Sequence, residues 1–360
     1  MLMHVITNFA ETGGAERMLA RLLSVSKDDR IVVVPLIGIS EHNRKLADNP
    51  NVIYAPQGAG SPLTLARATV RLAKLIREER PKAVLCWMYH AMVVGAVAGC
   101  IAGTRAPIYW NVRQSLDDPA SLSRSSRRAL WLGRLLSGLP TGIIYNSARA
   151  LKLHGQYGYR NQNAIVIPNG FNLPELDLPD SKRPRVLGAA GRFHPQKDYA
   201  TLFSAAALTL QTHPEAHFIA AGRGLSRDSS AVASLADAIG LDLDRIELRG
   251  EVSDISSFYR EIDAFVLSSR TEGFPNVVAE AMSYGKPVIT TDVGDAAAVV
   301  GDTGFVVPPQ DKEALAMAMR SMLDLSPEAY AARTRAARNR VEKEYALPRI
   351  AKKYRAFLGV

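Results

Sequence analysis

The sequence contains little cysteine: Cys86 and Cys100 are the only two in 360 residues. Because they are not in CxxC spacing, neither a disulfide framework nor a zinc site is indicated, and a reducing cytoplasm fits this usage. The amino terminus lacks a basic lead and a cleavage-like site, so we expect no secretory leader. Heptads and internal repeats are also missing, which leaves the oligomeric state open.

Signatures of nucleic-acid binding and of nucleotide cofactors are missing as well. No zinc-finger, RNA-binding or helix-turn-helix motif accompanies the net charge of +9, so we expect no nucleic-acid partner. Gly222-Arg-Gly224 lacks the third glycine of a dinucleotide fingerprint. The Asp-Leu-Asp at 242–244 imitates a metal-binding DxD, but it lies between a predicted helix and a predicted strand, so we expect a polar surface turn.

Residues 83–103 contain no Asp, Glu, Lys or Arg and are long enough to cross a membrane. The segment also contains His90 and three glycines, and it divides into a predicted strand at 83–88 and a predicted helix at 91–101. We therefore favour a soluble strand-loop-helix unit, with His90 on the loop. A histidine there faces the crevice of an open α/β sheet, although a structural role is the alternative.

Composition and charge fit a globular protein with one basic half. The chain is 47% hydrophobic with three tryptophans, and its length allows two domains. The first 170 residues hold 21 lysines and arginines against 10 aspartates and glutamates, a balance of +11, whereas the remainder holds 23 against 25. A basic face attracts phosphates, such as those of a membrane surface or a phosphorylated substrate.

A strand-turn-helix-strand unit occupies residues 264–293. Residues 264–267 are an apolar run typical of a buried parallel strand, and residues 287–293 predict the next strand. Pro275 stands where a first helical residue is expected, and Gly285 followed by Pro287 ends the helix. Ligands of such units collect outside the carboxyl ends of the strands.

Two carboxylates and a helix start make this unit a candidate binding site. Glu272 lies on the turn, and Glu280 lies on the margin of the apolar face of the helix. Unpaired N–H groups of residues 274–277 are a natural seat for phosphate or the polar edge of a sugar. The alternative is a solvated turn glutamate and a helix glutamate paired with a surface cation.

Two further loops resemble anion sites by their residue types. Gly13 and Gly14 precede an amphipathic helix, so the backbone can approach an anion closely, or the glycines merely permit a tight turn. Arg192 and Lys197 follow a predicted strand at 186–190, as diphosphate binding needs, or they lie on an ordinary surface loop.

Two predicted helices of the first half, at 64–79 and within 123–137, carry basic residues. Each stretch is either a solvated helix face or a surface that binds lipid phosphate or pyrophosphate. The residues concerned are Arg67, Arg71 and Lys74 on the first, and Arg124, Arg127 and Arg128 on the second.

Residues 269–289 read SRTEGFPNVVAEAMSYGKPVI, which resembles the Glu-x7-Glu signature of the family 4 retaining glycosyltransferases. Thr291-Asp-Val-Gly, the Gly-Gly-Ala-Glu-Arg of residues 13–17, and Gly-Arg at 191–192 with the downstream Lys-Asp are also similar to that family. The resemblance implies an α/β protein of two Rossmann-like doubly wound domains facing across a cleft, the GT-B fold. The implied domains are an acceptor-side domain at 1–170, a nucleotide-sugar domain at 171–345, and a helix at 346–360 that returns to the first domain. A linker is expected at 174–185.

The resemblance also implies roles for individual residues. It assigns catalysis to His90, Arg192, Lys197 and Glu272. It assigns donor binding to Gly13, Gly14, Arg192, Lys197, Val252, Glu272, Gly273, Phe274, Pro275, Asn276, Val277 and Glu280. Glu16, Asn111 and Arg113 are expected on the acceptor side.

The implied function is transfer of a hexose or N-acetylhexosamine from a UDP-sugar, with a GDP-sugar as the alternative, to a lipid-linked or cell-surface saccharide. Retention of configuration follows from the resemblance, and neither a metal nor a cofactor is expected. The enzyme would lie peripherally on the inner face of the cytoplasmic membrane. The alternatives are a sugar-nucleotide-binding protein or epimerase of GT-B type, and a two-lobed solute-binding protein.

Overall fold

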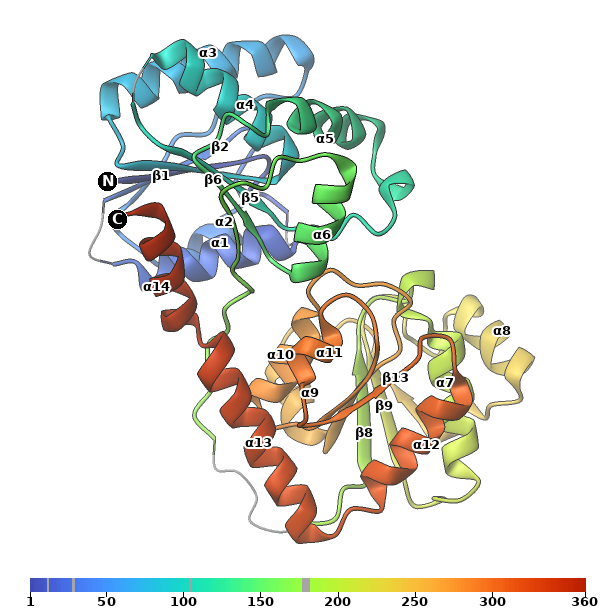
Figure 1. The fold of residues 1–360 in the computed structure, drawn as a ribbon. Helices are drawn as coiled ribbons and strands as arrows, with labels where there is room; N and C mark the ends of the chain where they lie inside the picture. Colours follow the sequence, from blue (N-terminus) through green and yellow to red (C-terminus); the bar gives the residue numbers. More distant parts are fainter. Residues whose placement is uncertain (12, 28–29, 104, 177–181) are drawn as a thin grey trace. The chain divides into compact units, whose positions relative to one another are not determined.

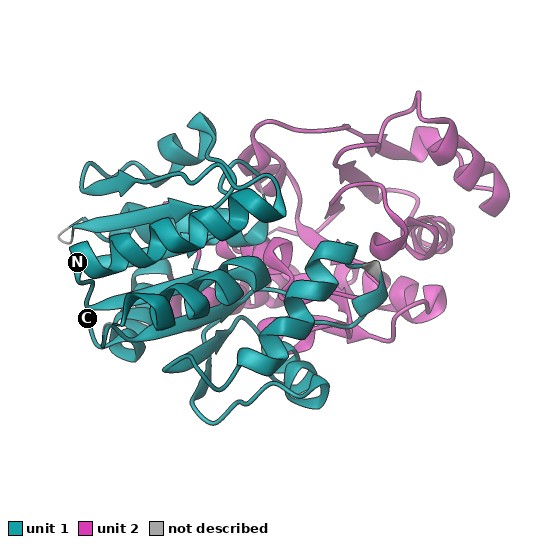
Figure 2. Cartoon of the chain, turned by 90° about the horizontal axis from the view of Figure 1, so that it is seen from above, with its two compact units in different colours: residues 1–170, 347–360 teal, residues 171–346 magenta. Residues whose placement is uncertain are grey.

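The computed structural model describes residues 1–11, 13–27, 30–103, 105–176 and 182–360. The chain divides into two compact units, which Figure 2 colours separately. Unit 1 comprises Met1–Gly170 and Leu347–Val360, and unit 2 comprises Phe171–Ala346. Of the linker expected at 174–185, residues 177–181 lie outside the described part of the chain.

Unit 1 is built on a seven-stranded parallel sheet in the order β3-β2-β1-β4-β5-β6-β7. The first strands are almost continuous runs of aliphatic residues, because a parallel sheet is covered on both faces. The strands are β1 (Leu2–Ile6), β2 (Ile31–Pro35), β3 (Val52–Tyr54), β4 (Ala83–Trp87), β5 (Ile108–Val112), β6 (Gly142–Tyr145) and β7 (Ala164–Val166).

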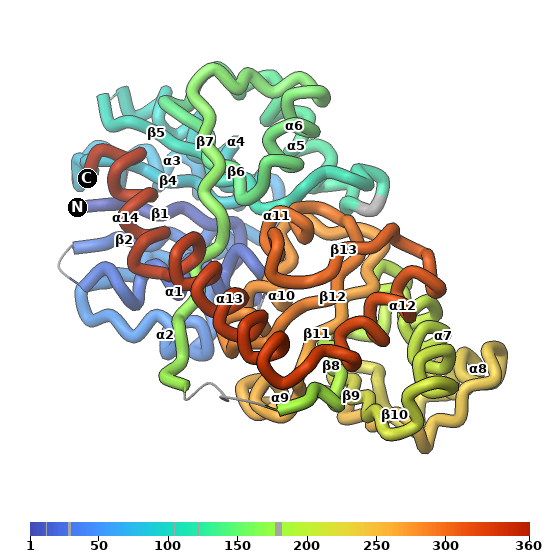
Figure 3. Tube along the Cα trace, turned by 60° about the horizontal axis from the view of Figure 1, so that its bottom comes forward, coloured from blue at the N-terminus to red at the C-terminus, as the bar shows by residue number. Residues whose placement is uncertain are grey.

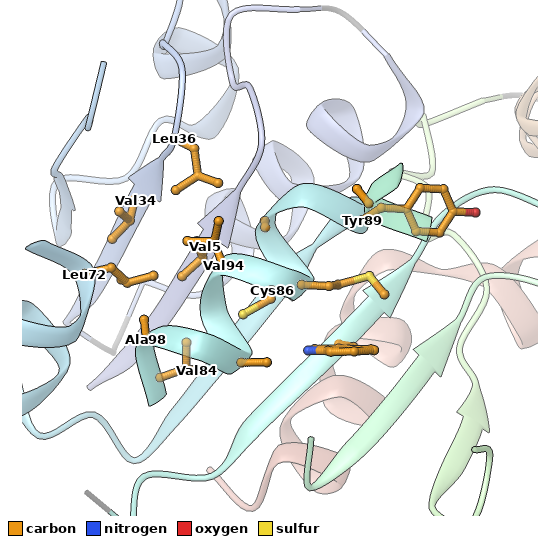
Figure 4. Close-up of a cluster of buried hydrophobic side chains, with 14 of the residues drawn as sticks. Val5, Val34, Leu36, Leu72, Val84, Cys86, Tyr89, Val94 and Ala98 are labelled. Atoms are coloured by element: carbon orange, nitrogen blue, oxygen red, sulfur yellow. The ribbon is translucent and has the colours of Figure 1, made fainter. Parts of the chain in front are cut away.

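Helices cover both faces of this sheet (Figure 1). One face carries α3 (Pro62–Glu79), α4 (Met88–Ala102), α5 (Arg124–Leu136) and α6 (Ala148–Tyr157). Figure 4 shows the core beneath them, where Val5, Val84 and Cys86 of neighbouring strands meet Leu72 of α3 and Ala98 of α4. The other face carries α1 (Gly14–Val25), α2 (Glu41–Ala47) and α14 (Leu347–Leu358).

Helix α14 is the last element of the chain and belongs to unit 1. It follows α13 (Pro327–Tyr345) after a single residue, as the trace in Figure 3 shows. Leu347, Ile350 and Tyr354 are buried against the face of the sheet that α1 also covers. The hydrophobic stripe of α14 therefore holds the end of the chain to unit 1.

Unit 2 has a six-stranded parallel sheet in the order β10-β9-β8-β11-β12-β13. Its strands are β8 (Val186–Ala190), β9 (His217–Ala221), β10 (Ile246–Leu248), β11 (Ala264–Leu267), β12 (Val288–Thr291) and β13 (Phe305–Val307). One face is covered by α7 (Tyr199–Leu210), α8 (Ser230–Ile239) and α12 (Lys312–Leu323), and the other by α9 (Ile255–Glu261), α10 (Asn276–Ser283), α11 (Ala296–Val300) and α13. The short 3-10 helices are η1 (Pro119–Ser121), η2 (Pro195–Lys197) and η3 (Leu243–Arg245).

Both sheets have the strand order of doubly wound folds, so the predicted fold class is confirmed for each unit. The uncharged segment 83–103 forms strand β4 and helix α4, with no loop between them. Within the described residues, none of the helices is both long and apolar enough to cross a membrane. The Asp-Leu-Asp of 242–244 lies at the exposed η3, where Asp244 pairs with Arg227 at 2.5 Å.

Candidate functional site

The candidate donor site of unit 2 lies where the strand order reverses, between β8 and β11. Loops leave the carboxyl ends of these two strands, and a crevice at such a switch point is the usual ligand position of an open α/β sheet. The loop after β8 carries Arg192 and Lys197, and the loop after β11 carries Glu272. The topology therefore brings Lys197 and Glu272 together, although 75 positions separate them in the sequence.

Lys197 and Glu272 form an ion pair across this switch point. The Lys197 Nζ lies 2.5 Å from Glu272 Oε1, and the two side chains are only 18% and 11% exposed. The Ser269 hydroxyl donates to the same Oε1 at 2.8 Å. Both contacts use Oε1, so Glu272 Oε2 takes part in neither. A partly buried cation and a carboxylate with one remaining oxygen form a site able to bind both phosphate and hydroxyl groups.

The loops that carry this pair are fastened to each other by further contacts. Gln196 Nε2 donates to the Thr271 carbonyl at 2.8 Å, and the Ser268 hydroxyl donates to the Lys197 carbonyl at 2.8 Å. Arg270 pairs with the buried Asp198 at 3.0 Å. Such contacts reduce the entropy cost of holding the ion pair in one geometry.

Asp198 is a buried carboxylate at the end of the loop after β8. Asp198 occupies the position before α7, but its side chain makes no capping hydrogen bond. Its carboxylate instead pairs with Arg270 and accepts from Thr201 at 2.8 Å. Arg270 and the Thr201 hydroxyl in the first turn of α7 together hold this carboxylate, and the contact with Asp198 raises the pKa of Arg270.

Arg192 lies on the same loop and is exposed to solvent. Among the described residues it forms no ion pair and no side-chain hydrogen bond that would occupy its guanidinium. Gly191, which precedes it, donates to the Ala221 carbonyl of β9 at 2.9 Å, so the backbone beneath the arginine is held in place. A permanently charged fork on a fixed backbone suits bidentate contact with phosphate.

Helix α10 starts at Asn276, one residue later than predicted. Pro275 precedes the helix with ψ of 86°, which is not helical. The ring of Phe274 is buried between Phe171 and Tyr345, at centroid distances of 6.2 and 5.8 Å, and this keeps the chain extended through Pro275. No side chain caps the start of α10, and the Val278 N–H donates to the Pro275 carbonyl at 3.0 Å.

The aromatic packing also corrects the donor-site prediction for Phe274. Its side chain belongs to the core of unit 2, so only its backbone is available to a ligand. The side chains of Val252 and Val277 are half-buried against the same core. Glu280 is half-buried, and the Tyr259 hydroxyl lies 3.4 Å from its Oε2.

Two glycines of the site have a role that only the folded structure shows. Gly222 has φ of 147°, and a Cβ at that position would lie 1.9 Å from the Gly191 carbonyl oxygen. Gly294 has φ of 56°, and a Cβ there would lie 2.3 Å from the Glu272 carbonyl oxygen. Each glycine lets a loop after one strand pass directly against the loop after its neighbour, where no side chain fits.

The corresponding switch point of unit 1 lies between β1 and β4. Thr7 follows β1, and its hydroxyl accepts the N–H of Ala91 in the first turn of α4 at 3.3 Å. Gly13 and Gly14 lie at the start of α1 on the loop after β1, as predicted. Glu16 is half-buried in the first turn of α1, and burial raises the pKa of its carboxyl.

His90 lies in the first turn of α4 and not on a loop, so that prediction is wrong. The helix begins early because Thr7, 84 positions away, satisfies one of its first N–H groups. The His90 Nε2 lies 2.7 Å from the Ser125 hydroxyl of α5, and burial lowers the pKa of the imidazole. His90 is therefore neutral near pH 7 and links two helices of unit 1.

Asn111 and Arg113 do not present themselves as acceptor-side groups. Strand β5 begins at Ile108, because Pro107 has no N–H for the ladder, and Asn111 therefore lies inside the strand. The Asn111 amide and the Arg113 guanidinium both donate to the Tyr354 hydroxyl, at 3.0 and 3.1 Å. Arg113 also lies over the Trp87 ring at 5.7 Å. These residues fasten helix α14 to the sheet.

Replacing Tyr354 with phenylalanine is expected to destabilise unit 1 by about 1–3 kcal/mol, because two buried donors lose their acceptor. Urea unfolding monitored by circular dichroism measures the change. Tyr54→Phe, at a half-buried tyrosine of the same unit, is the matched control. Equal stabilities of the two variants would contradict a role for Tyr354 in holding α14.

The basic stripes predicted in unit 1 lie on exposed helix faces. Arg67, Arg71 and Lys74 are exposed on α3, and Arg124, Arg127 and Arg128 are exposed on α5. On α3, Arg71 donates to the Gln57 carbonyl at 3.1 Å and Lys74 pairs with Glu78 at 3.6 Å.

Comparison with known families accounts for most of both units. The sequence profile of Glycosyltransferase Family 4 matches residues 12–175. The profile of Glycosyl transferases group 1 matches residues 184–324, which include Arg192, Lys197, Glu272 and Glu280. The chain belongs to glycosyltransferase family 4. The enzyme class is thereby glycosyl transfer, and not sugar-nucleotide epimerisation or solute binding.

Individual relatives of this family 4 glycosyltransferase agree. The chain is 26% identical over 260 residues to the lipopolysaccharide core biosynthesis mannosyltransferase LpsB of Rhizobium meliloti, a match covering 62% of the chain and 71% of LpsB. It is 35% identical over 138 residues to the corresponding mannosyltransferase LpcC of Rhizobium leguminosarum, covering 37% of the chain but only 39% of LpcC. The crystal structure of HepE from Anabaena in complex with UDP superposes with a TM-score of 0.81 over 100% of both chains at 22% identity, which shows the GT-B fold.

Proposed function

We propose that this family 4 glycosyltransferase moves a hexose or N-acetylhexosamine from a nucleoside diphosphate sugar to a lipid-linked or cell-surface saccharide, with retention of configuration. The observation that carries the proposal is the Lys197–Glu272 pair at the switch point of unit 2, with Arg192 exposed on the same loop. This arrangement offers cations for a diphosphate beside an acid for sugar hydroxyls. Crystal structures of HepE contain UDP and UDP-glucose, which supports a UDP-sugar as the first donor to test.

In this proposal, different residues of unit 2 bind different parts of the donor. Arg192 and Lys197 bind the diphosphate through their charged side chains. Glu272 Oε2 accepts a hydroxyl of the transferred sugar, and Glu280 accepts the ribose diol. Gly273 and Asn276 line the path between these two acids with backbone and side-chain polar groups.

The reaction breaks the bond between the anomeric carbon and a diphosphate oxygen, and forms a bond from the acceptor oxygen to the same face of that carbon. The sugar gains oxocarbenium character while negative charge collects on the leaving diphosphate. Arg192 and Lys197 stabilise this charge where it develops. A donor phosphate oxygen takes the proton of the acceptor hydroxyl, so the step uses no metal and no cofactor.

Unit 1 contributes the acceptor side in this proposal. Gly13 and Gly14 allow the backbone at the start of α1 to approach an anion closely, and Glu16 with its raised pKa lies two residues beyond. The first 170 residues hold 21 basic and 10 acidic residues, and this positive charge favours binding to an anionic bilayer that carries a lipid-linked acceptor. The rhizobial relatives carry the name of lipopolysaccharide core biosynthesis, which supports this acceptor class and a location on the cytoplasmic face of the membrane.

Titration calorimetry with UDP and with GDP tests the proposal. We expect one of the two nucleotides to bind, and Arg192→Ala to weaken its affinity roughly 10–100-fold, because a charge-assisted hydrogen bond is lost. Arg185→Ala is the control, since the exposed Arg185 precedes β8 at the opposite end of the same strand. If neither nucleotide binds the wild-type enzyme, the proposed function fails.

A further inference from the structure

The exposed face of helix α5 is the most distinctive surface outside the two switch points. Arg124, Arg128, Trp131 and Leu135 follow one another at helical spacing of four, three and four residues, so they form a single stripe. Trp131 is 51% exposed and Leu135 is 54% exposed, although both are large and apolar. An exposed tryptophan beside arginines is unusual for a surface that meets only water.

The charge of α5 is of one sign. The helix contains four arginines and no carboxylate, and the three in its first half show no ion pair with a described residue. Arg124, Arg127, Arg128 and Trp131 together line an open hollow of about 370 Å³. Cations around a shallow hollow with an aromatic wall are suited to phosphate headgroups.

Helix α5 is held firmly to the body of unit 1 by its opposite face. Leu130 and Ala129 are buried in the core, and the Tyr159 hydroxyl donates to the Leu130 carbonyl at 3.1 Å. A Cβ at Gly133 would lie 2.3 Å from the Tyr159 hydroxyl, so the helix rests directly on this tyrosine. The stripe is therefore presented by a rigid element rather than by a loop.

The basic stripe of α3 differs from that of α5 because it includes a carboxylate and has no exposed aromatic side chain. Glu78 lies on the same face as Arg67, Arg71 and Lys74, and it pairs with Lys74. The exposed apolar residues of α3 are Leu63 and Val70, at 63% and 60%, and neither is aromatic. The α3 stripe therefore resembles a solvated helix face with internal ion pairing.

We propose that the α5 stripe, Arg124, Arg127, Arg128, Trp131 and Leu135, is the surface by which unit 1 docks on an anionic lipid bilayer. This inference rests on the proposed function in one respect, the membrane-linked acceptor, which gives docking a purpose. The arginines meet lipid phosphates, and Trp131 and Leu135 enter the boundary between headgroups and acyl chains. A second copy of this chain is a less suitable occupant, because two identical faces of arginines would repel each other.

Flotation with vesicles of phosphatidylglycerol and phosphatidylethanolamine tests the docking surface. We expect the wild-type enzyme to float with these vesicles, to stay behind with pure phosphatidylcholine, and to release at high salt. The triple variant Arg124→Gln, Arg127→Gln, Arg128→Gln is expected to lower the partition coefficient roughly 100-fold, because each basic residue near the surface contributes about a factor of five.

Two further triple variants of the same charge change serve as controls. Arg80→Gln, Lys82→Gln, Arg105→Gln removes exposed cations that precede β4 and β5, and Arg67→Gln, Arg71→Gln, Lys74→Gln neutralises the α3 stripe. Both are expected to change partitioning less than about 5-fold. Equal losses in all three variants, or no flotation of the wild type, would overturn the proposal.

Tryptophan fluorescence reports the insertion of α5 directly. Trp87 and Trp110 are completely buried, so Trp131 is the tryptophan of this chain that solvent and lipid can reach. Anionic vesicles should shift its emission to the blue and protect it from acrylamide, and Trp131→Phe should abolish the response. A concentration-dependent dimer that Trp131→Asp dissolves, without any lipid response, would instead assign the face to self-association and overturn the proposal.

Failure of docking and failure of the proposed function give different results. Nucleotide binding depends on unit 2, so UDP or GDP titration of the α5 triple variant should match the wild type. If the wild-type enzyme binds nucleotide but not anionic vesicles, the result contradicts the docking inference alone. If the enzyme binds vesicles through α5 but binds neither UDP nor GDP, the result contradicts the proposed donor chemistry alone.

Discussion

Replacing Lys197 with alanine is expected to lower kcat about 10²–10³-fold while unit 2 stays folded. The ammonium group lies 2.5 Å from Glu272 in a partly buried setting, so its field on a leaving diphosphate is weakly screened. Steady-state kinetics with saturating donor and acceptor measures the loss. Lys197→Arg should recover only part of the rate, since a planar fork replaces a point charge.

Lys312→Ala is the matched control for this variant. Lys312 and Glu313 form a lysine–glutamate pair in the same unit, but at 3.8 Å and with side chains 52% and 72% exposed. Exposed pairs contribute little, so the control should keep wild-type kinetics and stability. A loss of activity equal to that of Lys197→Ala would show that removal of any lysine disturbs unit 2.

A double-mutant cycle with Glu272→Gln separates two roles of Lys197. If the lysine acts only by holding the carboxylate in place, the double variant should be no slower than Glu272→Gln alone. If it also stabilises the diphosphate, the double variant should be slower than either single variant. We expect the second result, and the first would restrict Lys197 to a positioning role.

Gly222→Ala is expected to destabilise unit 2 by about 3 kcal/mol and to weaken nucleotide binding at least 10-fold. The backbone of Gly222 has φ of 147°, and the added Cβ would press on the Gly191 carbonyl oxygen at 1.9 Å. The loop that carries Arg192 must then move. Thermal unfolding and UDP titration on the same preparation check both effects.

Gly240→Ala distinguishes steric conflict from backbone strain. Gly240 also has positive φ, 68°, but nothing lies within 4 Å of the position of its Cβ. This control should cost only about 1 kcal/mol and leave nucleotide binding intact. Similar losses in the two variants would mean that the contact between the loops after β8 and β9 contributes nothing to the site.

The units and most of their elements follow from local pattern alone. Helices α12 and α13 are local features, because their apolar spacing and their caps, Asp311 and Ser326, belong to the same short segments. The strand-turn-helix-strand unit around Glu272 is likewise a local feature. Boundaries failed where a distant group intervened, as Thr7 did for the start of α4.

The candidate site was only half visible in the sequence. Arg192, Lys197, Glu272 and Glu280 were found because residue types and spacing mark them. The roles of Gly222, Gly294 and Asp198 were not visible, since these roles come from loops that pass close together only in the folded sheet. Asn111 and Arg113 were placed on the acceptor side, yet Tyr354, more than 240 positions away, holds both.

The sequence by itself determined that the chain forms two α/β units, that one half is basic, and that a Glu-x7-Glu segment follows a buried strand. These are properties of short segments, which local periodicity and composition express directly. The tertiary structure alone decided that Lys197 meets Glu272, that α14 fastens to β5, and that the α5 stripe is exposed. The physical reason is that strand order and helix packing bring distant residues together, and neither is encoded within any one segment.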